Sequence, residues 1–166
     1  MEIWSGGQTG VDRAALDAAL DRGFPIGGWI PKGRLAEDGV VPLKYATLRE
    51  AGTPDYGERT RLNVRDTDAT LLLSWGEPHG GTRETSDVAR ELGRRMLTID
   101  LATADPATAA AQLRSWLGSL GPVRRLNVAG PRASQAPLAY DRAREMLRFA
   151  FDTLGGANQR AGEPTR

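Results

Sequence analysis

Short apolar runs alternate along the chain with segments in which apolar residues recur every three or four positions. The first pattern is typical of strands and the second of helices, and glycine or another turn residue stands at each junction. This alternation predicts an α/β domain whose central sheet is mostly parallel.

The predicted elements fill most of the chain. Strands are expected at 3–4, 25–31, 69–75, 96–101 and 125–130, and helices at 11–22, 56–66, 106–120, 140–154 and after the turn at 76–82. Residues 32–55 form a polar loop longer than a connection needs, which indicates a functional or partly mobile segment. We expect one domain, residues 1–154, followed by a disordered polar tail, residues 155–166.

Composition agrees with one globular domain. The 166 residues are enough for a full core, and apolar and charged residues make up 40% and 26% of the chain, as in ordinary soluble proteins. No run approaches the roughly 20 apolar residues of a membrane helix, and the start lacks the layout of a signal peptide. We therefore expect a cytoplasmic protein.

The scarcity of cysteine and histidine excludes several kinds of site. The absence of cysteine excludes disulfides, thiolate zinc sites, iron–sulfur clusters and cysteine nucleophiles, and a single histidine, His79, excludes a multi-histidine metal site. A bound metal would need oxygen ligands or would arrive inside a cofactor. No nucleophile paired with a histidine is visible, so the residues alone give catalysis little support. The net charge of +1 gives no overall attraction to nucleic acid or to a membrane.

Three loops rich in glycine, proline and hydroxyl groups follow predicted strands: SGGQTG (5–10), HGGT (79–82) and GPRAS (130–134). Ligands of open parallel sheets lie beyond the carboxyl ends of the strands, where we expect these loops to meet. The first two loops also open helices, whose free amides and dipole favour an anion. Together the loops predict a pocket for a phosphorylated small molecule, although their spacing matches neither GxGxxG nor GxxxxGK[ST]. The alternative is that they are only tight turns.

Several candidate residues also have simpler interpretations. Thr9 and Asp12 fit a helix-capping T-x-x-D pattern, and Thr82 is a natural N-cap. His79 lies either beside the ligand or simply in solvent.

Charged side chains offer further candidates. Arg59, Arg61 and Arg65 lie along one predicted helix, a pattern typical of a solvated face, whereas Arg132 in the third loop is a better phosphate ligand because it follows a strand. The long loop carries a mixed cluster of basic and acidic side chains, Lys32, Arg34, Glu37 and Asp38. Such a cluster could orient a polar ligand or act as acid and base; otherwise it is a balanced surface loop.

With these residues in view, the sequence resembles the molybdenum-cofactor carrier family, a circularly permuted branch of the Rossmann-like SLOG (lysine-decarboxylase-like) superfamily. The matching stretches are SGGQTGVDRAALDAAL, PIGGWIPKGRLAEDG, YGERTRLNVRDTDATLLL, HGGT and LNVAGPRAS. They lie in family order and extend from residue 3 to about residue 150. The resemblance implies a Rossmann-like three-layer sandwich that binds molybdenum cofactor (molybdopterin), often as a homo-oligomer, with molybdoenzymes as recipients.

The same resemblance implies the residues that bind the cofactor, and it implies no catalytic or metal-ligating residue. The first loop would contribute Gly6, Gly7, Gln8, Thr9 and Gly10, and the second Gly80, Gly81 and Thr82. A lid would comprise Lys32, Gly33, Arg34, Glu37 and Asp38, and the far wall Gly130, Pro131, Arg132 and Ser134. Arg59 and Asn63 match the family's ERTRLNV helix, which favours a binding role over a solvated face.

Composition bears on the choice between carrying and catalysis. The cofactor's molybdenum is held by the dithiolene sulfurs of its own pterin, so a chain without cysteine or histidine ligands can bind it through phosphate and pterin contacts. An enzyme that uses the metal commonly adds a protein ligand. The sequence therefore favours a carrier.

The superfamily also supplies two alternatives, a nucleoside-monophosphate phosphoribohydrolase-like enzyme and a nucleotide sensor, whose ligand would be a nucleotide or another phosphorylated small molecule. The hydrolases carry PGGxGTxxE, whose glutamate helps to cleave the base from a ribose phosphate. Here the loop reads HGGTRETSD, so Thr85 occupies the glutamate's position and Glu84 lies one residue early, about 100° around a helix. Hydrolysis is therefore the less favoured function unless Asp12, Glu37 or Asp38 substitutes.

Overall fold

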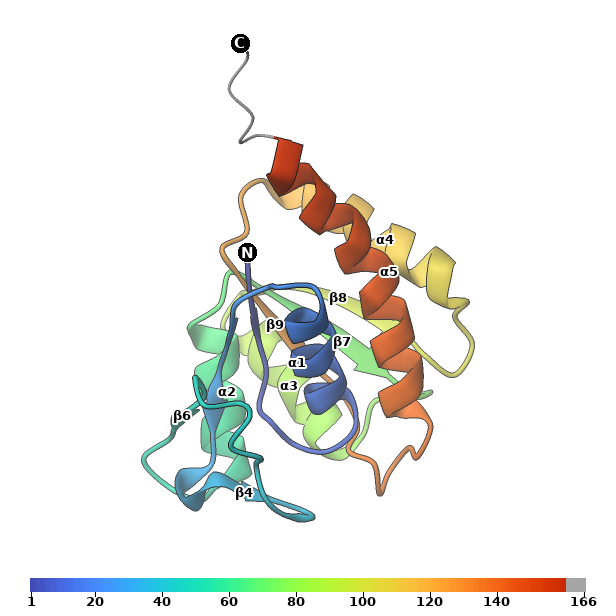
Figure 1. The fold of residues 1–166 in the computed structure, drawn as a ribbon. Coiled ribbons are helices and arrows are strands. Elements are labelled where there is room, and N and C mark those ends of the chain that lie inside the picture. Colours follow the sequence, from blue (N-terminus) through green and yellow to red (C-terminus); the bar gives the residue numbers. More distant parts are fainter. Residues whose placement is uncertain (161–166) are drawn as a thin grey trace.

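The computed structural model describes residues 1–160, with side chains up to residue 154. Its centre is a parallel sheet of five strands in the order β2, β1, β9, β7 and β8. These strands are β1 (Glu2–Trp4), β2 (Ile26–Gly27), β7 (Ala69–Ser74), β8 (Arg95–Asp100) and β9 (Arg125–Ala129). Helices cover both faces of the sheet (Figure 1), so the predicted α/β, Rossmann-like three-layer sandwich is confirmed.

The helices form two layers. On one face, α5 (Ala139–Arg160) packs against both α1 (Val11–Asp21) and α4 (Pro106–Leu120). On the other face, α2 (Tyr56–Arg65) and α3 (Gly80–Glu91) pack against each other. Aspartates cap two of these helices, because Asp55 accepts from the amide of Gly57 and Asp105 from that of Thr108. Each carboxylate satisfies an amide that the first helical turn leaves free.

The core lies between the sheet and these helices. Every residue of β7 is buried, as its unbroken apolar run predicts for a central strand. Ala14 and Ala15 of α1 are fully buried, and their small side chains let the helix lie close to the sheet. The last three predicted strands agree with the observed ones to within a residue at each end.

The prediction of one strand at 25–31 is wrong. Two short strands replace it: β2 in the main sheet, and β3 (Trp29–Ile30), which pairs with β6 (Arg49–Glu50). Gly28 separates them with a φ of 132°, and a Cβ there would lie 2.1 Å from the Ser5 carbonyl oxygen. Only glycine combines this backbone conformation with this close approach, so the chain leaves the main sheet at Gly28.

The predicted loop at 32–55 contains short elements and is fixed to the core at its base. It begins with a 3₁₀ turn (Lys32–Arg34), continues through the hairpin of β4 (Leu35–Ala36) and β5 (Gly39–Val40), and ends near β6. Val41 and Tyr45, which follow the hairpin, are buried. We call residues 35–40 the lid hairpin.

Helix α5 runs to Arg160, beyond residue 154, where the sequence predicted the domain to end. Glycine weakens a helix by about 1 kcal/mol relative to alanine but keeps its amide donor, so Gly155 and Gly156 need not end it. The rest of the predicted tail, residues 161–166, lies outside the described residues. Within the described part of the chain, no helix combines the length and apolar character needed to cross a membrane.

Candidate functional site

The three predicted loops meet at one edge of the sheet. β1, β9 and β7 are parallel neighbours, so their carboxyl ends lie side by side. SGGQTG follows β1, GPRAS follows β9, and HGGT comes shortly after β7. Residues far apart in the chain therefore form one rim, at the edge where the sequence predicted it.

A narrow pocket opens among these loops and helices α2 and α3. Its cavity volume is about 30 Å³, room for roughly two water-sized groups. Its wall consists of Gln8, Asp12, Arg59, Thr60, Gly81, Thr82, Thr85, Ala129, Gly130, Arg132 and Gln135. A smaller hollow beside it shares four of these and adds Gly6, Asn63 and Asn127. The structure thus brings together eight of the predicted residues: Gly6, Gln8, Arg59, Asn63, Gly81, Thr82, Gly130 and Arg132.

Three buried polar atoms of this pocket have no hydrogen-bond partner among the described residues: Gln8 Nε2, Arg59 Nε and Thr82 Oγ1. All three can donate a hydrogen bond. The orientation of the Gln8 amide is fixed because its Oε1 accepts from the amides of Thr9, at 3.1 Å, and Glu37, at 2.9 Å. Leaving buried donors unpaired is costly, so the pocket suits a group rich in acceptor oxygens.

Arg59 supplies the charge at the centre of this pocket. Its Nη1 donates to Asp12 Oδ2 at 3.0 Å, and the two side chains are only 14% and 4% exposed. Burial raises the pKa of Asp12, although the neighbouring guanidinium opposes this rise. A Cβ at Gly6 would lie 1.4 Å from Arg59 Nη1. The glycine at position 6 therefore makes room for an arginine of the protein.

Some backbone amides at the first loop are paired within the protein. Gln8 N–H donates to Asp12 Oδ2 at 3.2 Å, and Thr9 N–H donates to Gln8 Oε1. Val11 N–H donates to the carbonyl of Pro131 at 3.2 Å, which holds the first loop to the third. The amides of Gln8 and Thr9, two of the five that the sequence assigned to an anion, therefore already have partners within the protein.

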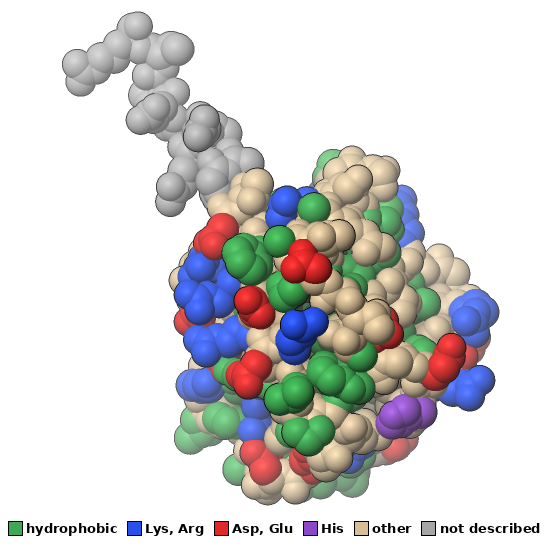
Figure 2. Space-filling model, turned by 90° about the vertical axis from the view of Figure 1, so that its right-hand side faces the viewer, with side chains coloured by type: hydrophobic (Ala, Val, Ile, Leu, Met, Phe, Trp, Pro, Cys, Tyr) green, Lys and Arg blue, Asp and Glu red, His purple; other side chains and the backbone are tan. Residues whose placement is uncertain are grey.

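The interpretation of Thr9 and Thr82 as helix caps is wrong. Helix α1 begins after Gly10, and Thr9 Oγ1 instead accepts from the amide of Ala133 at 3.0 Å. Thr82 is the third residue of α3, which begins at Gly80, and it lines the pocket. His79 precedes α3, makes no capping bond with its side chain and lies exposed on the surface (Figure 2), as its simpler interpretation expected.

Helix α2 divides its predicted residues between two environments. Arg61 and Arg65 form exposed ion pairs, which agrees with a solvated face, whereas Arg59 turns into the pocket. Asn63 borders the smaller hollow but uses its amide on the backbone of Trp29, accepting from its N–H and donating to its carbonyl at 2.8 Å each. Asn63 therefore fixes β3 against α2.

The basic residues of the predicted lid do not line the pocket. Arg34 donates to backbone carbonyls between residues 41 and 45 and so fixes the base of the lid hairpin. The amide of Gly33 donates to Glu50 Oε2 at 2.6 Å, and Lys32 is exposed. None of these three residues lines the pocket or the smaller hollow beside it.

The acidic residues of the lid hairpin reach the loops. Asp38 accepts from Arg13 through hydrogen bonds of 2.5 and 2.7 Å, and Arg13 Nε donates to the Gly7 carbonyl at 3.2 Å. The bonds from Arg13 lower the pKa of Asp38. The hairpin tip is therefore tied to the first loop.

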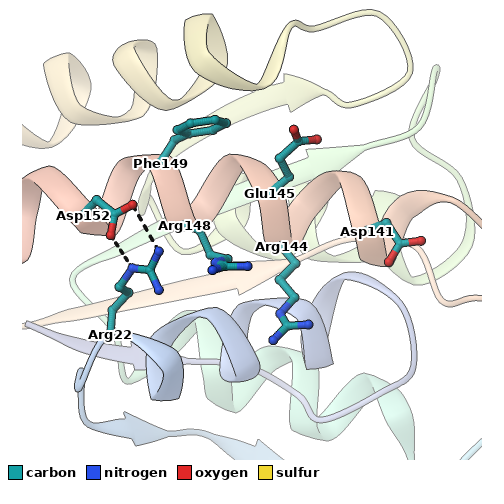
Figure 3. A pocket seen from close by; sticks show the side chains of 7 residues that line it. All are labelled: Arg22, Asp141, Arg144, Glu145, Arg148, Phe149 and Asp152. Atoms are coloured by element: carbon teal, nitrogen blue, oxygen red, sulfur yellow. Dashed lines mark hydrogen bonds and ion pairs between the residues drawn. The ribbon is translucent and has the colours of Figure 1, made fainter.

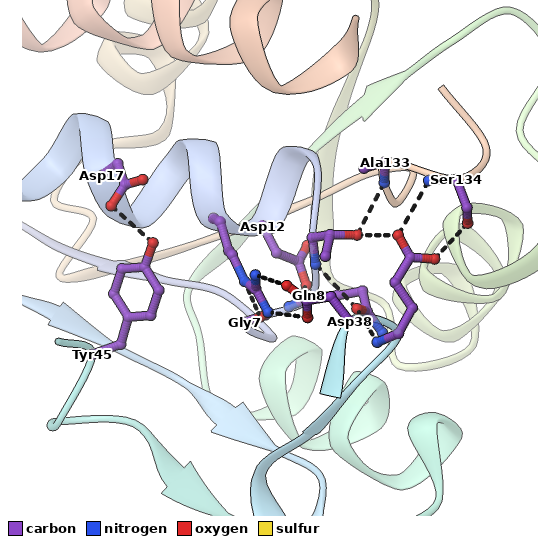
Figure 4. A network of polar contacts seen from close by, with 11 residues as sticks. Gly7, Gln8, Asp12, Asp17, Asp38, Tyr45, Ala133 and Ser134 are labelled. Atoms are coloured by element: carbon purple, nitrogen blue, oxygen red, sulfur yellow. Dashed lines mark hydrogen bonds and ion pairs between the residues drawn. The ribbon is translucent and has the colours of Figure 1, made fainter. Parts of the chain in front are cut away.

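Glu37 ties the same tip to the third loop. Its carboxylate accepts from Ser134 N–H at 3.1 Å and from the hydroxyls of Ser134 and Thr9, and Arg132 Nε lies 3.9 Å away. Figure 4 draws the contacts of Ser134 with this carboxylate as dashed lines. Burial raises the pKa of Glu37, but the bonds from Ser134 and Thr9 outweigh burial, so the net pKa lies below its usual value.

A larger hollow lies elsewhere, along the outer face of α5 (Figure 3). Its cavity volume is about 410 Å³, and it is lined by Arg22, Asp141, Arg144, Glu145, Arg148, Phe149 and Asp152. Arg22 pairs with Asp152, and Arg144 pairs with Asp21 at 2.7 Å. None of the predicted site residues lines this hollow, which we call the α5 groove.

Sequence reasoning missed several residues of the pocket wall. Thr60, Ala129 and Gln135 each stand next to a predicted residue in the chain, so extending each motif by one position would have found them. Thr85 entered only as the replacement for a catalytic glutamate. It lines the pocket and donates to the Gly81 carbonyl at 2.9 Å, while Glu84 is exposed.

The chemistry available in the pocket is that of binding an oxygen-rich anion. Residues 1–160 contain no group of three or more histidine, cysteine, aspartate or glutamate side chains placed to hold a metal ion. Thr85 stands where the hydrolases have their glutamate. It lines the pocket, and its side chain carries a hydroxyl and not a carboxylate.

Comparisons with known proteins agree with this fold and its motifs. Residues 3–151 match the family described as the circularly permutated YpsA SLOG family. The crystal structure of the "putative molybdenum carrier protein" from Syntrophus aciditrophicus SB is similar, with 45% sequence identity and a TM-score of 0.86, over 90% of this chain and 93% of that one. No curated protein matched the sequence. The chain therefore belongs to the circularly permutated YpsA SLOG family.

Proposed function

We propose that the protein binds the molybdenum cofactor and carries it to molybdoenzymes without changing it chemically. The observation that carries the proposal is the set of buried donors, Gln8 Nε2, Arg59 Nε and Thr82 Oγ1, which lack acceptors within the described chain. A phosphate offers several acceptor oxygens and a negative charge, which suits donors beside a guanidinium. The similar protein from S. aciditrophicus is named a molybdenum carrier, which supports this choice of cargo.

The donor set fits the phosphate of the cofactor better than its metal. Molybdenum is held by the pterin's own dithiolene, and the described residues offer no cluster of metal ligands. A cavity of about 30 Å³ has room for only one or two oxygen-sized groups, so in this proposal oxygens of the phosphate enter it while the rest of the phosphate sits at its mouth and the pterin remains outside. Gln8, Arg59 and Thr82 then bind and orient the phosphate.

The test mixes the purified protein, under anaerobic conditions, with cofactor released from a molybdoenzyme. Molybdenum should elute with the protein from a size-exclusion column, and the cofactor should survive oxidation longer than in buffer alone. Absence of molybdenum from the protein fractions, together with an unchanged oxidative lifetime, would reject the carrier function.

A nucleotide is the alternative occupant, because its phosphate would meet the same donors. We expect a panel of nucleoside monophosphates to remain intact with the protein, since Thr85 stands where the hydrolases have their glutamate. Release of free base would instead assign hydrolysis. A change of oligomeric size on adding a nucleotide would favour the sensor.

A further inference from the structure

The lid hairpin places a carboxylate among donors typical of a phosphate site. Glu37 accepts from the Thr9 hydroxyl, the Ser134 hydroxyl and the Ser134 amide, with the Arg132 guanidinium beside it. Thr9 and Ser134 are 28 and 97 positions away from Glu37 in the chain, so the fold itself assembles these groups. Hydroxyls, backbone amides and guanidinium groups are the usual partners of phosphate oxygens. We call Thr9, Arg132 and Ser134 the rim anion site.

The rim anion site is continuous with the pocket. Arg132 belongs to both, because its guanidinium lies near Glu37 and its side chain lines the pocket wall. Gln8 also joins them, since its Oε1 accepts from the amide of Glu37 while its Nε2 is one of the unpaired buried donors. A ligand that reaches Gln8 and Arg132 therefore meets the carboxylate of Glu37 at the mouth of the pocket.

The tip of the lid hairpin can separate from the three loops while the base of the hairpin stays in place. Leu35 and Val40 on the hairpin are 40% and 62% exposed, and Ala36 is its one buried apolar side chain, whereas Val41 and Tyr45 behind it are buried. The tip is held by the polar contacts of Glu37 and Asp38. Segments with few buried apolar contacts open locally at a low cost in free energy, so the tip can move while its base stays in the core.

We propose that Glu37 is an internal substitute for the ligand: its carboxylate fills the rim anion site in the free protein, and a phosphate monoester seated at the pocket mouth, between the buried donors and the rim anion site, displaces it on binding. The choice of a phosphorylated ligand rests on the proposed function. A phosphate monoester carries up to two negative charges and three terminal oxygens, against one charge and two oxygens for a carboxylate, so it satisfies the same donors better. The two anions repel each other, and the hairpin tip opens as the phosphate enters.

Displacement has a consequence for release of the cargo. A protein whose binding-competent form is only a fraction of the total binds more weakly by that fraction. Glu37 therefore lowers affinity in the free protein and returns to the rim when the ligand leaves, which favours handing the ligand on.

The experiment uses inorganic sulfate as the probe, because sulfate has the tetrahedral shape of phosphate and is not consumed. Its affinity is measured by calorimetric titration for the wild type, Glu37→Gln and Glu37→Ala. The matched control is Glu91→Gln, the same change at an exposed glutamate that pairs with Arg61. We expect the Glu37 variants to bind sulfate about tenfold more tightly, if the closed form outnumbers the open one by that factor, and the control to match the wild type. Adding Arg132→Ala to Glu37→Gln should abolish the gain.

A second measurement needs no variant. Sulfate should increase amide hydrogen exchange across residues 35–40 of the wild type, because the lid hairpin opens. Equal or weaker sulfate binding in both Glu37 variants, or the absence of sulfate binding in all of them, would overturn the displacement.

These outcomes are separate from those of the cofactor experiment. Cofactor that elutes with the wild type, together with unchanged sulfate affinity in the Glu37 variants, leaves the carrier function standing and removes the role of Glu37. A sulfate gain without cofactor retention supports the rim anion site and removes the cofactor as its ligand. Circular dichroism of each variant verifies that it is folded.

Discussion

The pocket at the carboxyl edge of the sheet and the α5 groove are opposite in size and in chemistry. The groove has a cavity volume of about 410 Å³, against about 30 Å³ for the pocket. In the groove, Arg22 and Arg144 form ion pairs that solvent reaches, whereas Arg59 and Asp12 form a pair that is almost completely buried. The pocket, although much smaller than the α5 groove, is thus the region in which the fold has removed charged groups from water.

Unpaired polar atoms separate the two regions further. The pocket holds three buried donors without partners in the described chain, while the groove holds one, Arg144 Nε. The Arg144 side chain is 37% exposed, so water solvates the rest of its guanidinium. In the function we propose, these unpaired buried donors, and not volume, mark the binding site.

The largest expected effect is on the free energy of unfolding, and it appears when removal of an arginine from the pocket is compared with removal of an arginine from the groove. Arg59→Ala leaves the buried carboxylate of Asp12 without its partner and should lower the free energy of unfolding by about 3–5 kcal/mol. Arg22→Ala breaks only an exposed pair with Asp152 and should leave the free energy of unfolding nearly unchanged. Denaturant titration of both variants measures the difference.

A double variant shows whether buried charge is the cause. Adding Asp12→Asn to Arg59→Ala removes the stranded charge and should recover a large part of the lost free energy of unfolding. If Arg59→Ala is as stable as Arg22→Ala, the buried pair does not distinguish the pocket from the groove.

Arg59 also shows how far the sequence leads toward the site. The strands and helices follow from local patterns, and the parallel order of β1, β9 and β7 then brings the three loops together, as predicted. Spacing along the helix cannot tell whether Arg59 or Arg61 turns inward; the family resemblance favoured Arg59, and in the structure Arg59 lines the pocket while Arg61 forms an exposed ion pair.

Long-range contacts account for what the sequence could not predict. The split at Gly28 depends on the Ser5 carbonyl, and the position of Glu37 depends on Ser134, 97 residues away. The pairing of the first-loop amides is the local exception, since Asp12 accepts from Gln8, four residues before it, where the capping pattern assigned Asp12 another partner. The two long-range contacts form only when the segments that carry them have come together.

The next largest effect is expected on cofactor retention, and it tests the role of the unpaired donors. Thr82→Val removes a buried hydroxyl without a partner in the described chain, and Thr60→Val removes a pocket hydroxyl that already donates to the Tyr56 carbonyl. A hydrogen bond to a charged group contributes about 1.5–3 kcal/mol, so Thr82→Val should weaken cofactor retention about tenfold or more. Thr60→Val should have a clearly smaller effect. Equal losses in molybdenum retained on a size-exclusion column would mean that the free donor has no special role.

A smaller effect is expected from the pH dependence of the lid. The pKa of Glu37 lies below its usual value of 4.5, so its ionised form stabilises the folded protein above that pH, and this stabilisation is lost as the pH falls through the lowered pKa. The free energy of unfolding of the wild type should therefore exceed that of Glu37→Gln at neutral pH and approach it in acid. Asp12, whose raised pKa acts in the opposite direction, is present in both proteins and cancels. A difference that stays constant from neutral to acidic pH would contradict this role of the carboxylate.

The smallest effect is expected in the α5 groove, where it tests the comparison itself. Arg148 lines the groove and is exposed, so its guanidinium is solvated with or without a ligand. Arg148→Ala leaves no buried group unpaired, and cofactor retention should equal that of the wild type in the assay used for Thr82→Val. The contrary result, loss of cofactor in Arg148→Ala and full retention in Thr82→Val, would locate the cargo in the larger hollow. In that case volume and exposed charge would mark the binding site, and the buried donors of the pocket would hold water.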